Sequence, residues 1–254
     1  MKPFVSIVII FLLAMQLNAR DVGETEITTE DGIEVFQNAK YYLLKKNVEI
    51  KSDNFTLNAN EVKINFDKSL YDIIELNAKG DVVFDSPEYN LRGNGDNLKF
   101  EVKIENLKVE GQDSELITSD IKMLSNGLIE VNNKNGKFSL KGPNSKLIND
   151  RIVIVSESID GFFSNKQETK EIISLNVVDE KISYIKNNET EMYAKKITYD
   201  NKTSIIELID SVTIIRNDER IIGDYGTLDT KNNSYKIKSS NQTKVKVIIQ
   251  SDEQ

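Results

Sequence analysis

Two stretches of this chain, separated by about half its length, carry the same residues in the same order. The first copy reads Leu57-x-Ala59-x-x-Val62-x-Ile64-x-Phe66-Asp67, then Ile73-Ile74-Glu75-Leu76, Gly80-x-Val82 and Leu91-x-Gly93. The second copy reads Met192-x-Ala194-x-x-Ile197-x-Tyr199-Asp200, then Ile205-Ile206-Glu207-Leu208, Val212-x-Ile214 and Ile222-Gly223-Asp224. Self-similar segments of this type indicate a protein that stacks one strand–turn unit and binds along its length rather than at a single catalytic point.

Almost all of the chain after residue 19 is typical of short strands. Runs such as Leu98-x-Phe100-x-Val102-x-Ile104 alternate apolar with polar residues, and a period of two places the apolar members on one face of a sheet. Clusters of Asn, Asp, Gly and Lys separate the runs and favour tight turns. We therefore expect an all-β chain that forms one continuous structure with a less regular middle at residues 113–178. A split into two lobes near residue 180 is the alternative.

The N-terminus has the features of an export signal. Lys2 precedes an apolar run from Phe4 to Leu17, and Ala19 supplies a small residue at a plausible cleavage site. The run is shorter than the about 20 residues that span a bilayer. We therefore expect cleavage near Ala19 and export to the periplasm, with an uncleaved membrane anchor as the alternative.

Composition argues against several classes of function. The net charge is −8, whereas nucleic-acid binding depends on a clustered basic face. The chain has no Cys and no His, so it lacks thiolate ligands, disulfides, the commonest transition-metal ligand and the usual general base near neutral pH. We expect no nucleic-acid partner, no metal and no cofactor.

No motif in the sequence predicts an active site. The carboxylate pairs Asp113/Glu115 and Asp179/Glu180 are best explained as chance neighbours among 41 acidic residues. The Asp/Asn-rich turns match neither the EF-hand loop nor the nonapeptide calcium repeat. The turn at 93–95 lacks the Lys-Ser/Thr and the helix of a phosphate loop, and the serines lack a nucleophile-elbow motif. The expected function is therefore not enzymatic.

The repeated pattern resembles the OstA-like family, which includes the LptA-like periplasmic bridge proteins of lipopolysaccharide transport. The family repeat has the form L-x-A-D-x-V-x-Y, a charged turn, a short apolar strand, G-x-V-x-V and a strand bearing L-x-G-D. The segments that match it here are 57–64 and 80–84 in the first copy, and 193–200 and 222–229 in the second. The sequence departs from the pattern at Asn60 and Lys195, where the family favours Asp, and at Ser211, which replaces a Gly before Val212.

The resemblance implies an open β-jellyroll, a solenoid-like stack of two antiparallel sheets whose apolar trough shields lipid A acyl chains. It implies a bridge protein that binds lipopolysaccharide and carries it from the inner to the outer membrane. Its partners would be the inner- and outer-membrane transport subunits, joined by pairing of edge strands, and further copies of itself in a head-to-tail oligomer. Two alternatives are a membrane-anchored jellyroll subunit of the same machinery and a structural β-solenoid that binds no lipid. A third and less favoured alternative is an exported β-helix enzyme that acts on polysaccharides.

We expect a signal peptide at 1–19, an N-terminal segment leading into the first strands at 20–44, an OstA-like β-jellyroll at 45–240 and a polar tail at 241–254. The repeat copies lie at about 45–110 and 180–240. Alternation also predicts which side chains face the lipid, although a slip of one residue in strand pairing would invert the set. These residues are Phe55, Leu57, Val62, Ile64, Phe66, Ile74, Leu76, Ile197, Tyr199, Ile206, Leu208, Val212 and Ile214.

Overall fold

The computed structural model describes residues 24–69, 72–164, 170–240 and 243–249, and these are almost entirely β-strand. Its strands are β1 (Glu26–Thr28), β2 (Ile33–Phe36), β3 (Tyr41–Lys51), β4 (Thr56–Phe66), β5 (Ile73–Ser86), β6 (Leu91–Glu101), β7 (Asn106–Glu110), β8 (Ser114–Ile117), β9 (Lys122–Ser125), β10 (Leu128–Asn132), β11 (Lys137–Ile148), β12 (Ile152–Phe163), β13 (Ile172–Asn187), β14 (Thr190–Asp200), β15 (Ile205–Arg216), β16 (Glu219–Asp229), β17 (Ser234–Lys238) and β18 (Lys246–Ile249). Two short 3-10 turns, η1 (Pro87–Tyr89) and η2 (Val102–Ile104), lie between strands. The expected all-β class is confirmed.

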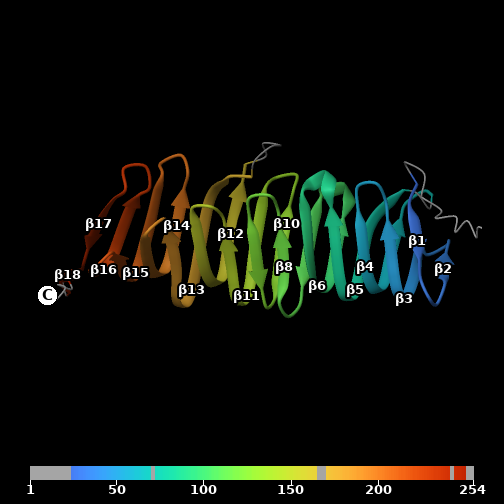
Figure 1. Ribbon diagram of the computed structural model, residues 1–254, viewed down its shortest axis with the longest axis horizontal. Coiled ribbons are helices and arrows are strands. Elements are labelled where there is room, and N and C mark those ends of the chain that lie inside the picture. Colours follow the sequence, from blue (N-terminus) through green and yellow to red (C-terminus); the bar gives the residue numbers. More distant parts are fainter. Residues whose placement is uncertain (1–23, 70–71, 165–169, 241–242, 250–254) are drawn as a thin grey trace, which may run out of the picture.

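The chain runs as one antiparallel meander along a long axis, with its first and last strands at opposite ends (Figure 1). Each long strand pairs with the next, from β3 with β4 through to β15 with β16. β7 and β8 are the two halves of one bent strand, because both pair with β6. In the same way, β9 and β10 are the halves of a strand that pairs with β11. β1 and β2 pair with β3, and β17 and β18 pair with β16, in the same way.

Each long strand is interrupted near its middle, where the pairing register shifts. The shift lies between Lys45 and Val48 in β3 and between Lys79 and Val82 in β5. Many of these bends have left-handed backbone residues, which are Lys46 and Asn47 in β3, Gly80 and Asp81 in β5, Gly142 and Asn144 in β11, and Asp210 and Ser211 in β15. Bulges of this kind turn a strand and increase its twist. Gly, Asn and Asp tolerate positive φ better than other residues.

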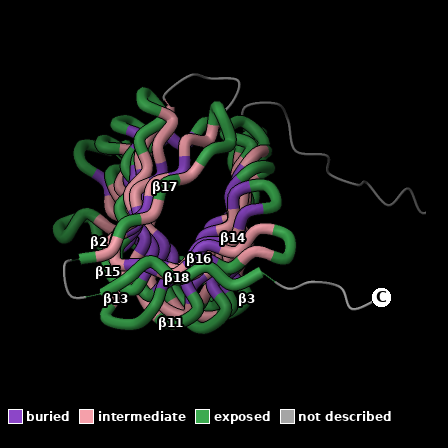
Figure 2. Tube along the Cα trace, turned by 90° about the vertical axis from the view of Figure 1, so that its left-hand side faces the viewer, coloured by how far each residue is buried: buried purple, intermediate pink, exposed green. Residues whose placement is uncertain are grey.

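The bends lie along one line, which we call the fold line, and they divide every strand into two halves. The two sets of halves form two facing arms, each a sheet, with buried residues on their inner faces (Figure 2). The turns at the arm tips form two rims. Rim A consists of the turns after β3, β5, β8, β11, β13 and β15, and rim B of the turns after β2, β4, β6, β10, β12, β14 and β16. The expected stack of two antiparallel sheets is therefore confirmed, as two arms of one folded sheet.

The bends correct one departure from the family pattern that the sequence analysis described. The sequence analysis placed Ser211 at the position of the family Gly. In the structure, Gly80 (φ 73°) and Asp81 (φ 49°) form the bend of β5, and Asp210 (φ 66°) and Ser211 (φ 57°) form that of β15. Asp210 is therefore the counterpart of Gly80, because each stands two residues before the Val that resumes the pairing. An Asp can replace the Gly because it also tolerates a left-handed backbone.

The middle of the chain continues the same meander, as expected for one continuous structure. Near residue 180, where the alternative was a split into two lobes, β13 bends between Val178 and Ser183 and stays paired with β12 on one side and β14 on the other. The tail at 241–254 is not wholly outside the sheet, because β18 pairs with β16. The segment before residue 45 likewise contains β1 and β2. The proposed signal peptide at 1–19 lies outside the described residues.

A carboxylate stabilises the bend between β12 and β13. Asp179 accepts hydrogen bonds from the hydroxyl of Ser156 (3.2 Å) and from the backbone N–H groups of Glu157 and Lys181 (both 2.9 Å). Burial opposes the charged form, but these bonds outweigh it and hold the pKa of Asp179 below its usual value. Of the pair Asp179/Glu180, Asp179 thus has a structural role at the fold line.

We expect Asp179→Asn to lower the free energy of unfolding by about 1 kcal/mol at pH 7, a modest value because the side chain is partly exposed. Since the folded-state pKa lies below the unfolded one, this stabilisation is present above the unfolded pKa and is lost as the pH falls through the folded one. Urea unfolding of both proteins should therefore give a difference that shrinks below about pH 4. A difference independent of pH, or the same loss in the neighbouring control Glu180→Gln, would contradict this role.

A glycine allows close packing inside the arms. Gly161 on β12 lies directly opposite Phe138, and a Cβ at this position would come within 2.4 Å of the Phe138 ring and 2.5 Å of the Ser174 carbonyl oxygen. Phe138 is buried and stacks on Phe163 with ring centroids 4.2 Å apart. The ring therefore has little room to move.

We expect Gly161→Ala to destabilise the fold by about 1–3 kcal/mol through overpacking, measured by denaturant unfolding. The control Phe162→Ala removes a larger side chain that is 44% exposed on the outer face, and it should cost at most about 0.5 kcal/mol. If Gly161→Ala were neutral, or the control equally costly, the assignment of inner and outer faces along β12 would be wrong.

Candidate functional site

The predicted apolar residues lie on the inner faces of the two arms, with one exception. Phe55 and Tyr199 are partly buried against the core. The buried residues are Leu57, Val62, Ile64, Phe66, Leu76, Ile197, Ile206, Leu208, Val212 and Ile214. Ile74 is 45% exposed, and its predicted inward position is wrong. A register shift pairs Phe66 with Ile73 and Asn65 with Glu75, which leaves Ile74 without a cross-strand partner.

The interior is a continuous apolar core that joins both arms along the molecule. Its buried members run from Tyr42 in β3 to Leu228 in β16, and many, such as Leu57 and Ile197, have no solvent exposure. The middle of the chain contributes as fully as the two repeat copies, for example through Phe138. In this structure the inner side chains contact one another, so an acyl chain can enter only where the arms separate.

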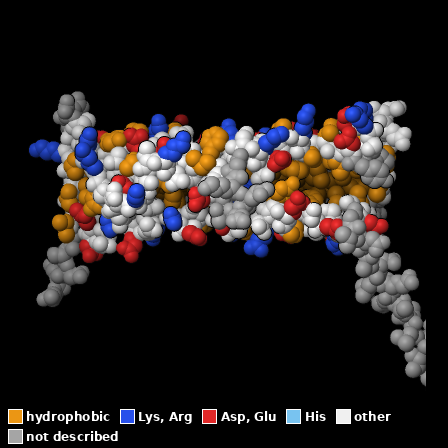
Figure 3. All heavy atoms as spheres, turned by 90° about the horizontal axis from the view of Figure 1, so that it is seen from above, with side chains coloured by type: hydrophobic (Ala, Val, Ile, Leu, Met, Phe, Trp, Pro, Cys, Tyr) orange, Lys and Arg blue, Asp and Glu red, His pale blue; other side chains and the backbone are white. Residues whose placement is uncertain are grey.

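The opening between the rims differs between the two halves of the molecule. Seen from above, hydrophobic side chains gather in a hollow over β3 to β6 (Figure 3). In this region Phe55, Leu91 and Phe100 are only partly buried where they pack against the core. The N-terminal half thus exposes part of its apolar interior.

Hydrogen bonds connect the two rims farther along the chain. The backbone N–H of Lys170 on rim B donates to Asp120 on rim A (3.2 Å). Near the C-terminal end, the Arg216 guanidinium donates to the Asn233 carbonyl oxygen (3.2 Å), and the Tyr235 hydroxyl donates to Glu219 (2.5 Å). These bonds hold the arms together over the second half of the molecule.

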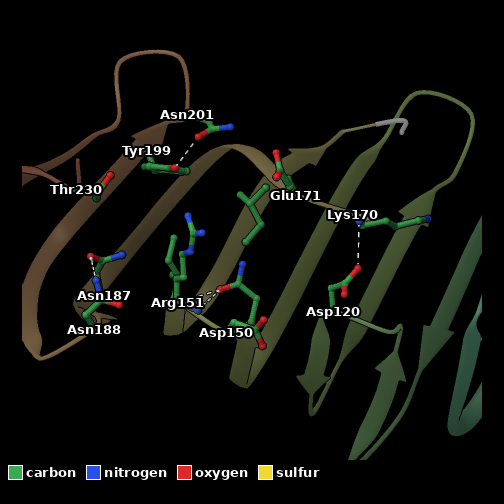
Figure 4. Close-up of a pocket in the computed structure, with 13 residues that line it drawn as sticks. Asp120, Asp150, Arg151, Lys170, Glu171, Asn187, Asn188, Tyr199, Asn201 and Thr230 are labelled. Carbon is green, nitrogen blue, oxygen red and sulfur yellow. Dashed lines mark hydrogen bonds between the residues drawn. The ribbon is translucent and has the colours of Figure 1, made fainter. Parts of the chain in front are cut away.

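A pocket of about 460 Å³ lies between the two rims in this second half. Rim A and its adjoining strand ends contribute Asp120, Asn149, Asp150, Arg151, Ile152, Asn187 and Asn188, and rim B with its strand ends contributes Lys170, Glu171, Ile172, Tyr199, Asn201 and Thr230. Figure 4 shows Arg151 and Asn187 directed into the space below Tyr199. Ile152 and Ile172 belong to the buried core, so the pocket adjoins the apolar interior.

Two titratable groups of the pocket already have hydrogen-bond partners within the protein. The Lys170 ammonium donates to Asn133 (2.8 Å), and burial lowers the pKa of Lys170. Burial also raises the pKa of Tyr199 above its usual value. The Tyr199 hydroxyl donates to Asn201 (3.0 Å). Sequence reasoning missed this pocket, because its residues come from turns whose proximity depends on the folding of the sheet.

The structure offers no metal-binding cluster within the residues it describes. No group of three or more acidic side chains there is placed to hold a metal ion. The Glu115 carboxylate forms an ion pair with Lys122 (2.7 Å) and so has a structural partner, while the backbone N–H of Asp113 donates to the Asn126 side chain (3.0 Å). Across the same ranges, no helix has the length and apolarity to cross a bilayer.

Comparison with known proteins places this geometry in a family. The family model described as "LptA/(LptD N-terminal domain) LPS transport protein" matches twice, over residues 31–137 and 123–234. A similar solved structure is LptH, the LptA homologous periplasmic component of the conserved lipopolysaccharide transport device from Pseudomonas aeruginosa. It is 14% identical, with a TM-score of 0.41, and the alignment covers 52% of this chain and 95% of that one. No curated protein matches the sequence significantly.

The two matches overlap at residues 123–137, so the middle of the chain belongs to both family units. Together they span residues 31–234, well over half of the chain. The protein therefore belongs to the LptA/LptD N-terminal domain family of lipopolysaccharide-transport proteins.

Proposed function

We propose that this protein binds lipopolysaccharide in the periplasm and forms part of a bridge that carries it from the inner to the outer membrane. The acyl chains lie between the two arms, and their passage needs no catalysis and no cofactor. The continuous apolar interior from Tyr42 to Leu228 is the observation that supports this most strongly. Acyl chains require apolar contact and exclusion of water, which such a lining supplies along its whole length.

The hollow over β3 to β6 is the point at which we expect lipid to enter. Phe55, Leu91 and Phe100 are partly exposed there, whereas the second half is bridged across the rims. Once inside, the chains contact the predicted inward residues other than Ile74. Replacing contacts between the arms by contacts with acyl chains keeps the apolar surface away from water, so the exchange costs little hydrophobic free energy.

The ends of the meander suit assembly with neighbours. Among the described strands, β1 and β2 pair only with β3, and β17 and β18 pair only with β16. Each end therefore has a free edge, with exposed apolar residues such as Val35 and Val247. Free edges pair readily with another strand. We propose that they join copies head to tail and join the inner- and outer-membrane subunits.

The proposed bridge function has two alternatives. A structural β-solenoid that binds no lipid is favoured by one observation, the absence of solvent exposure at inner residues such as Leu57 and Ile197. A membrane-anchored subunit of the same transport machinery would have the same jellyroll and would differ in retaining the N-terminal segment.

Photo-cross-linking separates lipid binding from a closed core. We expect a benzophenone amino acid at Phe100, on the inner face, to label added lipopolysaccharide. The matched control is Val83, an apolar residue that is 52% exposed on the outer face, and it should give little labelling. Labelling at neither position would favour the structural solenoid, and equal labelling would indicate non-specific adsorption.

Proline substitutions test head-to-tail assembly, because proline lacks the N–H needed for strand pairing. Val35→Pro blocks the N-terminal edge and Val247→Pro blocks the C-terminal edge. We expect each variant alone to be monomeric by light scattering at concentrations where the unmodified protein forms longer species. A mixture of the two should form a species of two subunits, because one intact edge of each remains. Unchanged sizes of the single variants would contradict assembly through these edges.

A further inference from the structure

We infer that the pocket between the rims is a saccharide subsite, which takes uncharged sugar units of an amphiphile whose acyl chains lie in the interior. This inference deepens the proposed function and rests on it. The pocket is formed by the thirteen residues given above, and its floor, its hydrogen-bonding groups and its charge all suit such a ligand.

The floor places the pocket at a boundary between polar and apolar surfaces. Ile152 and Ile172 are each 5% exposed and belong to the core that fills the interior. The surrounding side chains are amides, carboxylates and hydroxyls from both rims. An amphiphile with its chains between the arms would therefore present its head group at this level.

The hydrogen-bonding groups suit sugar hydroxyls. A hydroxyl both donates and accepts, and an Asn side chain offers two donors and an acceptor on one small group. The pocket has four Asn side chains, from Asn149, Asn187, Asn188 and Asn201. Asn187 is 6% exposed, and among the described residues its side-chain oxygen accepts one long bond, from Asn188 (3.4 Å), so its amide retains capacity for a ligand. The partly buried ring of Tyr199 adds an apolar face on which the C–H face of a sugar can pack.

The charge of the pocket favours an uncharged ligand over a phosphate. Three carboxylates line it, from Asp120, Asp150 and Glu171, against the two cations Arg151 and Lys170. The ammonium of Lys170 is already bonded to a neighbouring Asn side chain. A phosphate dianion would therefore meet a net negative site. Neutral hydroxyls meet no such repulsion, and carboxylates accept hydrogen bonds from them.

Arg151 is the pocket residue whose substitution tests ligand binding most directly. Its backbone N–H donates to Asn149 (3.0 Å), but its guanidinium has no hydrogen bond or ion pair to any residue in the described ranges. Figure 4 shows this side chain directed toward Tyr199. The side chain is exposed, so its truncation should leave the fold intact.

Titration calorimetry of the full chain tests the inference with three probes, all below their micellar concentrations: dodecyl maltoside, dodecyl phosphate and free maltose. We expect dodecyl maltoside to bind at least tenfold more tightly than dodecyl phosphate. Arg151→Ala should weaken dodecyl maltoside about tenfold, the loss of one hydrogen bond to a charged group, and should not strengthen the binding of dodecyl phosphate, because the pocket becomes more negative. Arg92→Ala, which removes an exposed arginine that does not line the pocket, is the matched control.

The outcomes separate the subsite from the proposed function. If both amphiphiles bind with equal affinity and Arg151→Ala affects neither, the interior takes acyl chains but the sugar subsite is wrong. If maltose binds in an Arg151-dependent way and neither amphiphile binds more tightly than maltose, the subsite stands and lipid carriage is wrong. Tighter binding of dodecyl phosphate, or binding of no probe, overturns the subsite.

Discussion

The bend at the middle of each strand is the constraint on which the rest of the structure depends. An antiparallel meander of this length, left flat, would expose one apolar face along its whole extent. Left-handed residues such as Gly80–Asp81 and Asp210–Ser211 turn the strands at the fold line, and the apolar face closes on itself. Because every strand bends at the same level, one sheet becomes two facing arms with a shared interior. The two rims, and the pocket between them, exist only as a result of this folding.

The closed interior is compatible with transport because the arms are joined along one side only. The fold line holds them together through backbone connections and side-chain bonds such as those of Asp179. At the rims, the hydrogen bonds from Lys170 to Asp120, from Arg216 to Asn233 and from Tyr235 to Glu219 all lie in the second half of the molecule. The arms can therefore separate without loss of strand pairing, in contrast to a barrel. Without lipid, contact between the arms keeps their apolar faces from water.

The sequence was sufficient to predict the interior but not the rims. Strict alternation identified inward residues such as Val62 and Ile206, because side chains in a strand alternate between the two faces. It failed at Ile74, where a register shift breaks the alternation, and bulges of this kind leave little trace in the sequence. The repeat also led to the prediction of a less regular middle. In the structure, β11 and β12 continue the same interior there with different residues, such as Phe138. The polar pocket could not be predicted, because Arg151 and Tyr199 face each other only after the sheet has folded.

Lipid uptake between the arms can be measured as a change in the distance between the rims. The chain has no Cys, so spin labels at Glu88→Cys on rim A and Lys103→Cys on rim B would be the only two in the protein. These two turns lie at the two ends of β6, and therefore on opposite rims. Pulsed electron paramagnetic resonance should show a longer distance when lipopolysaccharide is bound. An unchanged distance with lipid bound would show that the acyl chains do not lie between the arms.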